Sequence, residues 1–444
     1  MTPPKRRDDN WIDGLRGVAS FIVVTGHLCT CFVPYLLSPM KDEKGEQGMS
    51  IFQYPLLRLC VSGRAAVAIF FFITGFVNSL NPVKNARAGN TSVGLKNLAR
   101  STFTRSGRLV VPTTAATLIG WVLAETGVFS MAARSDSWWI QGVAEPPDPT
   151  FGAAVLHLLK TLVLSWDNGK MDFDKTHWTL VFFLKGSMRV YLALLAMTLL
   201  SKRSWYIITL FLYTYSWCTG DCLVGTNIYA GMFMAQLQID LGSRATSLLP
   251  KIVPSIIIVA SLFACSYPQE NQQWKPWSKK MMDFMVSITP GGTEHSRYWM
   301  SVGATLLIFG VFFSRNARKV LTMPLFNFLG RVSFPVYLLH DTVIRTLLVW
   351  MVYGPSASRL PAKDAEGKPV PLQRVSSLAF FFIIPVFYAA TYFIAYLWNW
   401  YVDPKCAKVV EWLKNLMFEN EVDVQTGEKP APLVAVTVDA NERK

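Results

Sequence analysis

The chain has 444 residues, of which 51% are hydrophobic and only 16% are charged. Soluble domains carry about 25% charged residues, so this composition excludes an ordinary soluble protein. The formal net charge is +14. We attribute this charge to basic loops on one face of a membrane and expect no nucleic-acid partner, because cytosolic loops of membrane proteins are rich in Lys and Arg.

Apolar blocks recur along most of the chain. Each is about 17 to 25 residues long, the length of helix that crosses a ~30 Å hydrocarbon core. The blocks lack the alternation of a transmembrane β-barrel. We therefore predict an all-α polytopic protein of the lipid bilayer. The ten expected spans are residues 17–37, 61–80, 108–124, 178–200, 204–220, 222–240, 252–267, 299–313, 326–352 and 375–402.

Basic residues predict the orientation of these spans. They cluster before the first span and in the loops after the second, fourth, sixth and eighth. With ten spans, all these clusters lie on one side together with both termini, and that side is expected to be cytosolic. The segment 151–166 is the weak point, because it is short and contains His157 and Lys160. We interpret it as an interfacial or re-entrant helix on the outer side, although an eleventh span is the alternative.

The pattern divides the chain into three parts. Residues 1–16 are a polar leader, which we expect to be cytosolic, and residues 17–402 form one transmembrane domain. Residues 403–444 are expected to be a cytosolic, partly disordered tail. A disulfide between Cys218 and Cys222 and buried free thiols both remain open. The spacing of Cys and His residues predicts no metal site.

The first span carries ionisable residues on one side of its helix. Arg16 and His27 are eleven residues apart, which is about three turns, and Asp13 lies about 40° from the same stripe. An ionisable group at membrane depth is costly, which makes it a candidate for function. A neutral His27 that only hydrogen-bonds to a neighbouring helix is the alternative.

Arginines gather before the third span. Arg100, Arg105 and Arg108 precede Pro112, and Arg105 and Arg108 are neighbours on one helical face. Guanidinium groups in this place can bind phosphates through forked hydrogen bonds. The alternative is that they only mark the cytosolic side.

The ninth span contains a second histidine at membrane depth. Ser333, Tyr337 and His340 fall on one stripe of that helix. Two such histidines can form an acid/base pair in an enzyme or a proton relay in a transporter. The spacing alone leaves both possibilities open.

Together, these segments resemble the membrane acyltransferase-3 family. Residues 12–19 (IDGLRGVA), with His27 behind them, are similar to its first-helix signature, and residues 61–76 resemble its second helix. Residues 105–108 (RSGR) resemble the paired arginines before its third helix, and residues 333–340 (SFPVYLLH) its late Ser-x-x-x-Tyr-Leu-x-His motif. The matches occur in the order of the family, and the long polar loops look most like those of fungal members.

One position departs from this resemblance. Trp178-Thr179-Leu180 resembles a family motif that is usually followed by a glutamate three residues later, and here that position is Phe183. The neighbouring His177 is either a substitute for this carboxylate or an interfacial histidine.

The resemblance implies an O-acyltransferase that moves an acyl group, often acetyl, from acyl-CoA to a hydroxyl of a glycan, lipid or small metabolite. It implies that Arg105, Arg108 and Arg100 bind the donor. It also implies that His27 is the general base and that Arg16, oriented by Asp13, binds the donor or the oxyanion.

The resemblance further implies that His340 completes the catalytic group, with Ser333, Tyr337 and Trp178 positioning the acceptor. The expected location is the endoplasmic reticulum or the plasma membrane. The alternatives are a proton-coupled transporter that uses the two histidines and a family member that has lost its activity.

Overall fold

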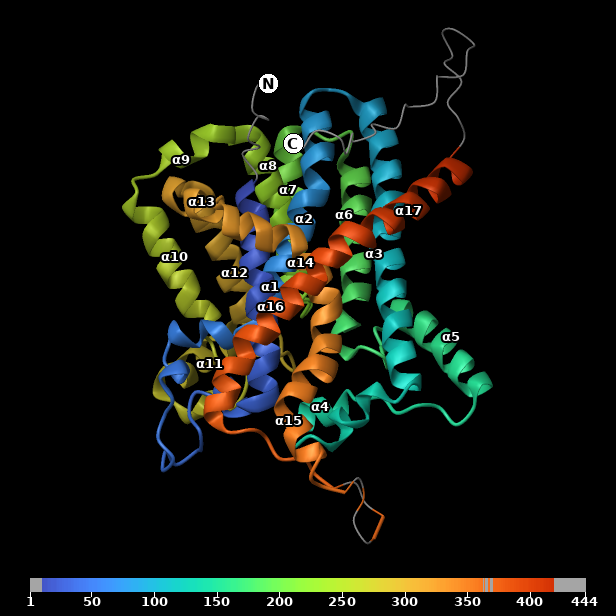
Figure 1. The fold of residues 1–444 in the computed structure, drawn as a ribbon. Coiled ribbons are helices and arrows are strands. Elements are labelled where there is room, and N and C mark those ends of the chain that lie inside the picture. The colour runs from blue at the N-terminus through green and yellow to red at the C-terminus, as the bar shows by residue number, and fades with distance from the viewer. Residues whose placement is uncertain (1–9, 362, 364–365, 368–369, 419–444) are drawn as a thin grey trace, which may run out of the picture.

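The computed structural model describes residues 10–361, 363, 366–367 and 370–418. The elements in this part of the chain are helices that pack side by side in one bundle (Figure 1). The all-helical prediction is therefore confirmed. The expected disorder of the tail concerns mainly residues 419–444, which lie outside the described residues.

Seven helices of the described chain are long and apolar enough to cross a membrane. They are α1 (Asn10–Phe32), α2 (Gly63–Arg87), α3 (Thr91–Glu125), α6 (Thr179–Met197), α12 (His295–Phe313), α14 (Pro324–Val343) continued by α15 (Val349–Ala357), and α16 (Ser377–Tyr401) continued by α17 (Asp403–Met417). The pair α8 (Gly225–Leu241) and α10 (Ile252–Cys265), with α9 (Ala245–Leu248) between them, passes the same test only as one unit bent by 107°. Helix α7 (Lys202–Cys218), with 17 residues, is not among the helices long enough to cross a membrane. Every predicted span coincides with a helix, but these lengths support seven or eight spans, so the count of ten remains a prediction.

The two ends of the bundle differ in composition. The start of α1, the α2–α3 turn, α9 and α13 (Arg315–Leu321) lie at one end, which we call the basic end (Figure 1). Helices α4 (Trp138–Gly142), α5 (Phe151–Asp167) and α11 (Pro276–Ile288) lie at the opposite end. The basic segments thus gather at one end, where we expect the cytosol. Helix α5 covers the segment 151–166, and it is not among the helices long enough to cross a membrane.

Two helices extend beyond the predicted spans. Helix α1 begins at Asn10 rather than at residue 17, because Trp11, Ile12 and Leu15 are buried against other helices, which outweighs the polarity of their neighbours. The predicted tail begins with helix α17, which packs on α3. A Cβ atom at Gly107 would lie 2.8 Å from a methyl group of Val410, so the missing side chain of Gly107 permits this packing.

Glycines set the crossing of α1 and α14. A Cβ atom at Gly330 would lie 2.0 Å from the carbonyl oxygen of Asp13. Gly14 faces α13 instead, where its Cβ atom would lie 1.9 Å from the carbonyl oxygen of Leu321. A Cβ atom at Gly17 would lie 2.5 Å from the nitrogen of Gly330. Small residues let helix backbones approach this closely in membrane bundles. The crossing brings the ionisable stripe of α1 against the Ser-Tyr-His stripe of α14.

Candidate active site

The two membrane-depth histidines meet. The ring centroids of His27 and His340 are 5.2 Å apart. The Nδ1 of His340 lies 3.1 Å from the carbonyl oxygen of Val336 and 2.9 Å from that of Tyr337. Because carbonyl oxygens only accept, Nδ1 must carry a proton. In the neutral ring, Nε2 is then a free acceptor, and it has no hydrogen-bond partner among the described residues.

His27 occupies a more open position than His340. Its side chain is partly exposed, whereas His340 is fully buried. Its ring also faces that of Trp139, with 5.3 Å between the centroids. The contacts of the described chain include no hydrogen bond from His27 to a neighbouring helix, so they give no support to a purely structural role.

Arg16 is anchored on the main chain of α14. Its Nε and Nη2 donate to the carbonyl oxygen of Gly330, at 3.2 and 2.7 Å. The Oδ1 of Asp13 lies 3.3 Å from Nη2. Ser333 also donates to the Gly330 oxygen, at 2.8 Å. Arg16 and Ser333 are therefore held side by side.

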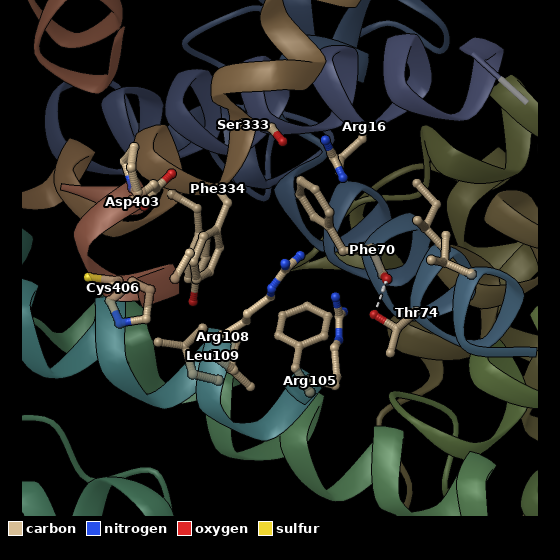
Figure 2. Close-up of a pocket in the computed structure, with 18 residues that line it drawn as sticks. Arg16, Phe70, Thr74, Arg105, Arg108, Leu109, Ser333, Phe334, Asp403 and Cys406 are labelled. Atoms are coloured by element: carbon tan, nitrogen blue, oxygen red, sulfur yellow. Dashed lines mark hydrogen bonds between the residues drawn. The ribbon is translucent and has the colours of Figure 1, made fainter. Parts of the chain in front are cut away.

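A cavity of about 510 Å³ adjoins this anchor. Arg16, Arg105 and Arg108 converge on it from α1 and α3 (Figure 2). Its lining also includes an apolar wall and the start of α17. The apolar wall comprises Phe70, Leu180, Phe183 and Phe334. Positive charge next to an apolar wall suits a ligand that has an anionic group and an apolar arm.

Tyr337 connects the wall of the cavity to His340. It lines the cavity together with Ser333, and its ring centroid is 6.1 Å from that of His340. Its hydroxyl donates to the carbonyl oxygen of Thr176 at 2.5 Å and lies 2.6 Å from the hydroxyl of Thr179. Neither His27 nor His340 lines the cavity.

Three further predicted site positions lie in different surroundings. Arg100 is exposed and does not line the cavity. Trp178 is also outside it, and the guanidinium carbon of Arg297 lies 5.7 Å from the centre of its ring. Phe183 lines the cavity and stacks on Phe71 at 4.2 Å. The position of the usual family glutamate therefore contributes an aromatic ring to the cavity wall.

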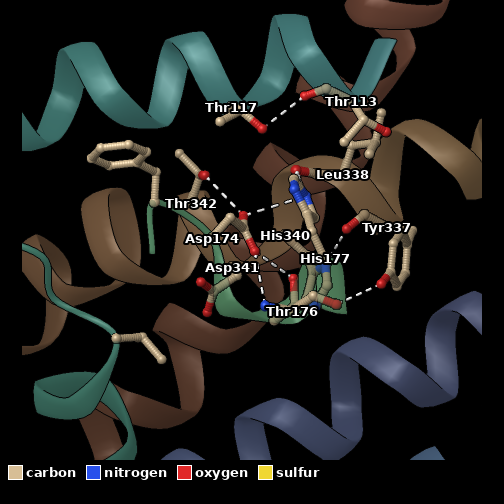
Figure 3. Close-up of polar contacts among 12 residues, drawn as sticks. Thr113, Thr117, Asp174, Thr176, His177, Tyr337, Leu338, His340, Asp341 and Thr342 are labelled. Carbon is tan, nitrogen blue, oxygen red and sulfur yellow. Dashed lines mark hydrogen bonds and ion pairs between the residues drawn. The ribbon is translucent and has the colours of Figure 1, made fainter. Parts of the chain in front are cut away.

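A buried ionic cluster beside His340 was not predicted (Figure 3). It consists of Asp174 and His177, which precede α6, with Asp341 on α14 and Arg345 in the π-helical turn that follows. Of the two alternatives for His177, the interfacial one does not fit its surroundings, because this residue is 1% exposed and its Nε2 lies 2.9 Å from the carbonyl oxygen of Leu338. The spacing of Asp341 and Arg345, opposite charges four residues apart within a predicted span, was a signal that could have revealed the cluster.

His157 belongs to a separate group near the opposite end of the bundle. Its Nδ1 lies 2.9 Å from Asp148 and its Nε2 lies 3.3 Å from Asp172. Burial lowers the pKa of His157, but the hydrogen bonds to these two carboxylates outweigh it, so the pKa is raised above its ordinary value. This histidine does not contact the cavity.

All seven cysteines are free thiols, so the possible disulfide between Cys218 and Cys222 is not formed. The described residues contain no group of three or more His, Cys, Asp or Glu side chains that could hold a metal ion.

Comparison with known proteins decides the family. Residues 9–400 match the sequence profile of an acyltransferase domain. The chain belongs to the acyltransferase-3 family. The arginines, the two histidines and the glycine crossing described above are thus features of a membrane acyltransferase.

The relatives of this acyltransferase include fungal proteins. It is 25% identical over 395 residues to "Acyltransferase R4" of a Phoma species, covering 75% of this chain and 82% of that protein. It is 23% identical over 463 residues to "O-acetyltransferase PaAT-1" of Phomopsis amygdali, covering 93% of this chain and 86% of that protein. It is also 23% identical to "Acyltransferase clz18" of Cochliobolus lunatus, covering 75% and 82% of the two chains. No solved structure matches the sequence.

Proposed function

We propose that this acyltransferase moves an acyl group, acetyl in the simplest case, from acyl-CoA to a hydroxyl group of a glycan, lipid or small metabolite. The observation that carries the proposal is the contact between the His27 and His340 rings, 5.2 Å apart, beside a cavity to which three arginines contribute. The Phomopsis relative is named an O-acetyltransferase, which supports acetyl as the group transferred.

The cavity suits the donor. CoA carries phosphates at one end and a thioester at the end of a long thin arm. Arg105 and Arg108, with Arg100 outside the cavity, would bind the phosphates, because guanidinium groups form forked, charge-assisted hydrogen bonds to them. The Nε of Arg105 is buried without a hydrogen-bond partner in the described part of the chain, so a ligand oxygen there would satisfy it. The apolar wall would hold the arm.

The reaction needs a base and a site for the oxyanion. His27 would take the proton of the acceptor hydroxyl while its oxygen attacks the thioester carbon. A carbon–oxygen bond forms, the carbon–sulfur bond breaks, and the imidazole returns the proton to the CoA thiolate. Arg16, held by Asp13 and Gly330, faces the cavity and would stabilise the oxyanion.

His340 and the neighbouring hydroxyl groups would complete the site. The free Nε2 of His340 can share the proton that His27 accepts. Ser333 and Tyr337, at the inner wall of the cavity, would position the acceptor. Trp178 would act on the acceptor only from outside the cavity. We expect the enzyme to work in the endoplasmic reticulum or the plasma membrane, with its basic end in the cytosol, where CoA is found.

The test is thiol release from acetyl-CoA by the purified protein in lipid nanodiscs, with water as the acceptor. His27→Ala is expected to abolish the release of CoA, while binding of acetyl-CoA and the thermal unfolding midpoint stay close to those of the wild type. His295→Ala is the matched control. The ring of His295 contacts the hydroxyl of Thr289, and this histidine does not line the cavity. Wild-type activity in His27→Ala would end the proposal, and an inactive wild-type protein would favour a transporter or an inactive family member.

A second experiment addresses the acceptor. Metabolite profiling of a strain without this protein is expected to show the loss of one acetylated species and the accumulation of its hydroxyl precursor. An unchanged profile of acylated compounds would contradict the proposed transfer.

A further inference from the structure

The buried cluster beside His340 contains charges that the proposed mechanism has not used. Asp174 is 3% exposed, and Asp341 and Arg345 are fully buried. Charged groups are expensive at this depth, so their retention calls for a function. Asp174 lies in the segment before α6, whereas Asp341 lies on α14, so the cluster joins two separate parts of the chain (Figure 3).

One guanidinium faces two carboxylates in this cluster. The Nε of Arg345 lies 3.0 Å from Asp341 and its Nη2 lies 3.7 Å from Asp174. Arg345 also donates to two main-chain oxygens, those of Val143 at 3.0 Å and Phe173 at 2.6 Å. Asp174 lies farther from the guanidinium than Asp341 does, so Arg345 balances the charge of Asp174 less completely. Burying an unbalanced charge is costly, so a proton on a nearby imidazole would be stabilised.

Asp174 is the carboxylate placed toward the histidines. Its Oδ1 accepts from the main chain and the hydroxyl of Thr176, at 3.1 and 2.6 Å, and its Oδ2 accepts from Thr342 at 3.3 Å. Its Oδ2 is also 3.5 Å from Nε2 of His177. Figure 3 shows the carboxylate beside His340, and its partner Thr342 follows that histidine by two residues. The hydrogen bonds fix the carboxylate and keep it in one orientation.

We propose that Asp174 is a positioning residue whose negative charge stabilises the imidazolium formed when the His27–His340 pair accepts the proton of the acceptor hydroxyl. Asp174 takes no proton itself: the proton moves from the hydroxyl to an imidazole and then to the CoA thiolate. This inference rests on the proposed function, because it requires the histidine pair to act as the base.

Other titratable or charged groups lie close enough to act on the pair or on this cluster. They are Lys175 and His177 before α6, Tyr337, Asp341 and Arg345 on the α14 segment, and Cys31 on α1. Among them, Asp174 is the carboxylate held by hydrogen bonds to Thr176 and Thr342.

Asp174→Asn tests the inference, because it keeps the size and the hydrogen-bond acceptor of the side chain but removes the charge. The pH dependence of thiol release from acetyl-CoA is measured with water as the acceptor. The histidine pair must be neutral to act as a base, so activity rises with pH through its apparent pKa. Losing a nearby carboxylate lowers that pKa, and the acid limb of the kcat profile should move to lower pH by about one unit or more. The plateau value of kcat should fall at least about tenfold, with the KM for acetyl-CoA unchanged.

Two comparisons make the result specific. Asp172→Asn removes a carboxylate two residues away that is bonded to His157, and its profile should match the wild type. Asp174→Glu keeps the charge, so its acid limb should stay at the wild-type position. If Asp174→Asn does not fold, as judged by its thermal unfolding, the smaller neutral variant Asp174→Ser is measured with the same expectation.

An acid limb that stays in place in the neutral variants would overturn the inference, even if kcat falls, since a purely structural role lowers activity without moving it. An equal shift in Asp172→Asn would overturn it as well. Failure of the proposed function looks different: His27→Ala would then keep its activity, whatever Asp174 does.

Discussion

The glycine crossing of α1 and α14 makes a quantitative prediction. In Gly330→Ala, the new Cβ atom would lie 2.0 Å from the carbonyl oxygen of Asp13, whereas an ordinary contact is 3.4 Å or more. The two helices must therefore separate by about 1.4 Å at this point, which is the difference between the two distances. The Asp13 oxygen belongs to the backbone and cannot rotate away, so the strain cannot be relieved by a side chain.

The separation would act on the site directly. Arg16 is held by the oxygen of Gly330, and His27 and His340 lie farther along the same two helices. A misplacement of about 1 Å can reduce a rate by about 100-fold, and overpacking costs about 1–3 kcal/mol of stability. We therefore expect Gly330→Ala to fold with a lower thermal midpoint and to lose about two orders of magnitude in kcat.

The assay is thiol release from acetyl-CoA in nanodiscs, measured beside thermal unfolding. Gly26→Ala is the matched control on α1, because its Cβ atom would lie 3.5 Å from its nearest neighbour, Gly63, which is an ordinary contact. This control should keep wild-type activity and stability. Wild-type kcat in Gly330→Ala would refute the reasoning that the close crossing sets the geometry of the catalytic group.

Three more predictions concern the donor, the cavity wall and pH. Arg105→Gln and Arg108→Gln should each raise the KM for acetyl-CoA about 10- to 100-fold, because each loses a charge-assisted hydrogen bond of about 1.5–3 kcal/mol, while Arg100→Gln, outside the cavity, should change it less. Phe183→Ala removes an aromatic ring from the apolar wall, so competition assays should show a relative gain for acyl-CoA donors with longer chains. The raised pKa of His157 means that its two carboxylate contacts add stability at low pH and that this stability is lost as pH rises through the raised value. The thermal midpoint of His157→Gln should therefore fall further below the wild type at pH 5.5 than at pH 8.5.

Each of these predictions has a clear opposite outcome. An unchanged KM in both cavity arginine variants would remove the donor from this cavity. An unaltered chain-length preference in Phe183→Ala would show that the acyl chain lies elsewhere. An equal loss of stability at both pH values in His157→Gln would show that the charge of this histidine does not contribute.

Local patterns in the sequence determined the fold class, the residues that share a helical face and the family. The apolar blocks predicted the all-helical fold because the length and hydropathy of a span are properties of contiguous residues. The helical period predicted the shared stripes of Arg16 with His27 and of Ser333 with Tyr337 and His340, because residues three or four apart lie on one face whatever the helix packs against. The family followed from the same short segments.

Tertiary contacts decided the rest. Only the close approach at Gly17 and Gly330 brings His27 to His340, since no pattern within one helix specifies which face of another helix it meets. The cluster around Asp174 joins a loop residue to α14 across more than 160 positions of the chain, and α17 becomes a cavity wall because Gly107 leaves room for Val410. These features depend on packing between segments that are distant in the chain. Hydropathy and periodicity describe neighbouring residues only, so they do not predict which distant segments pack together.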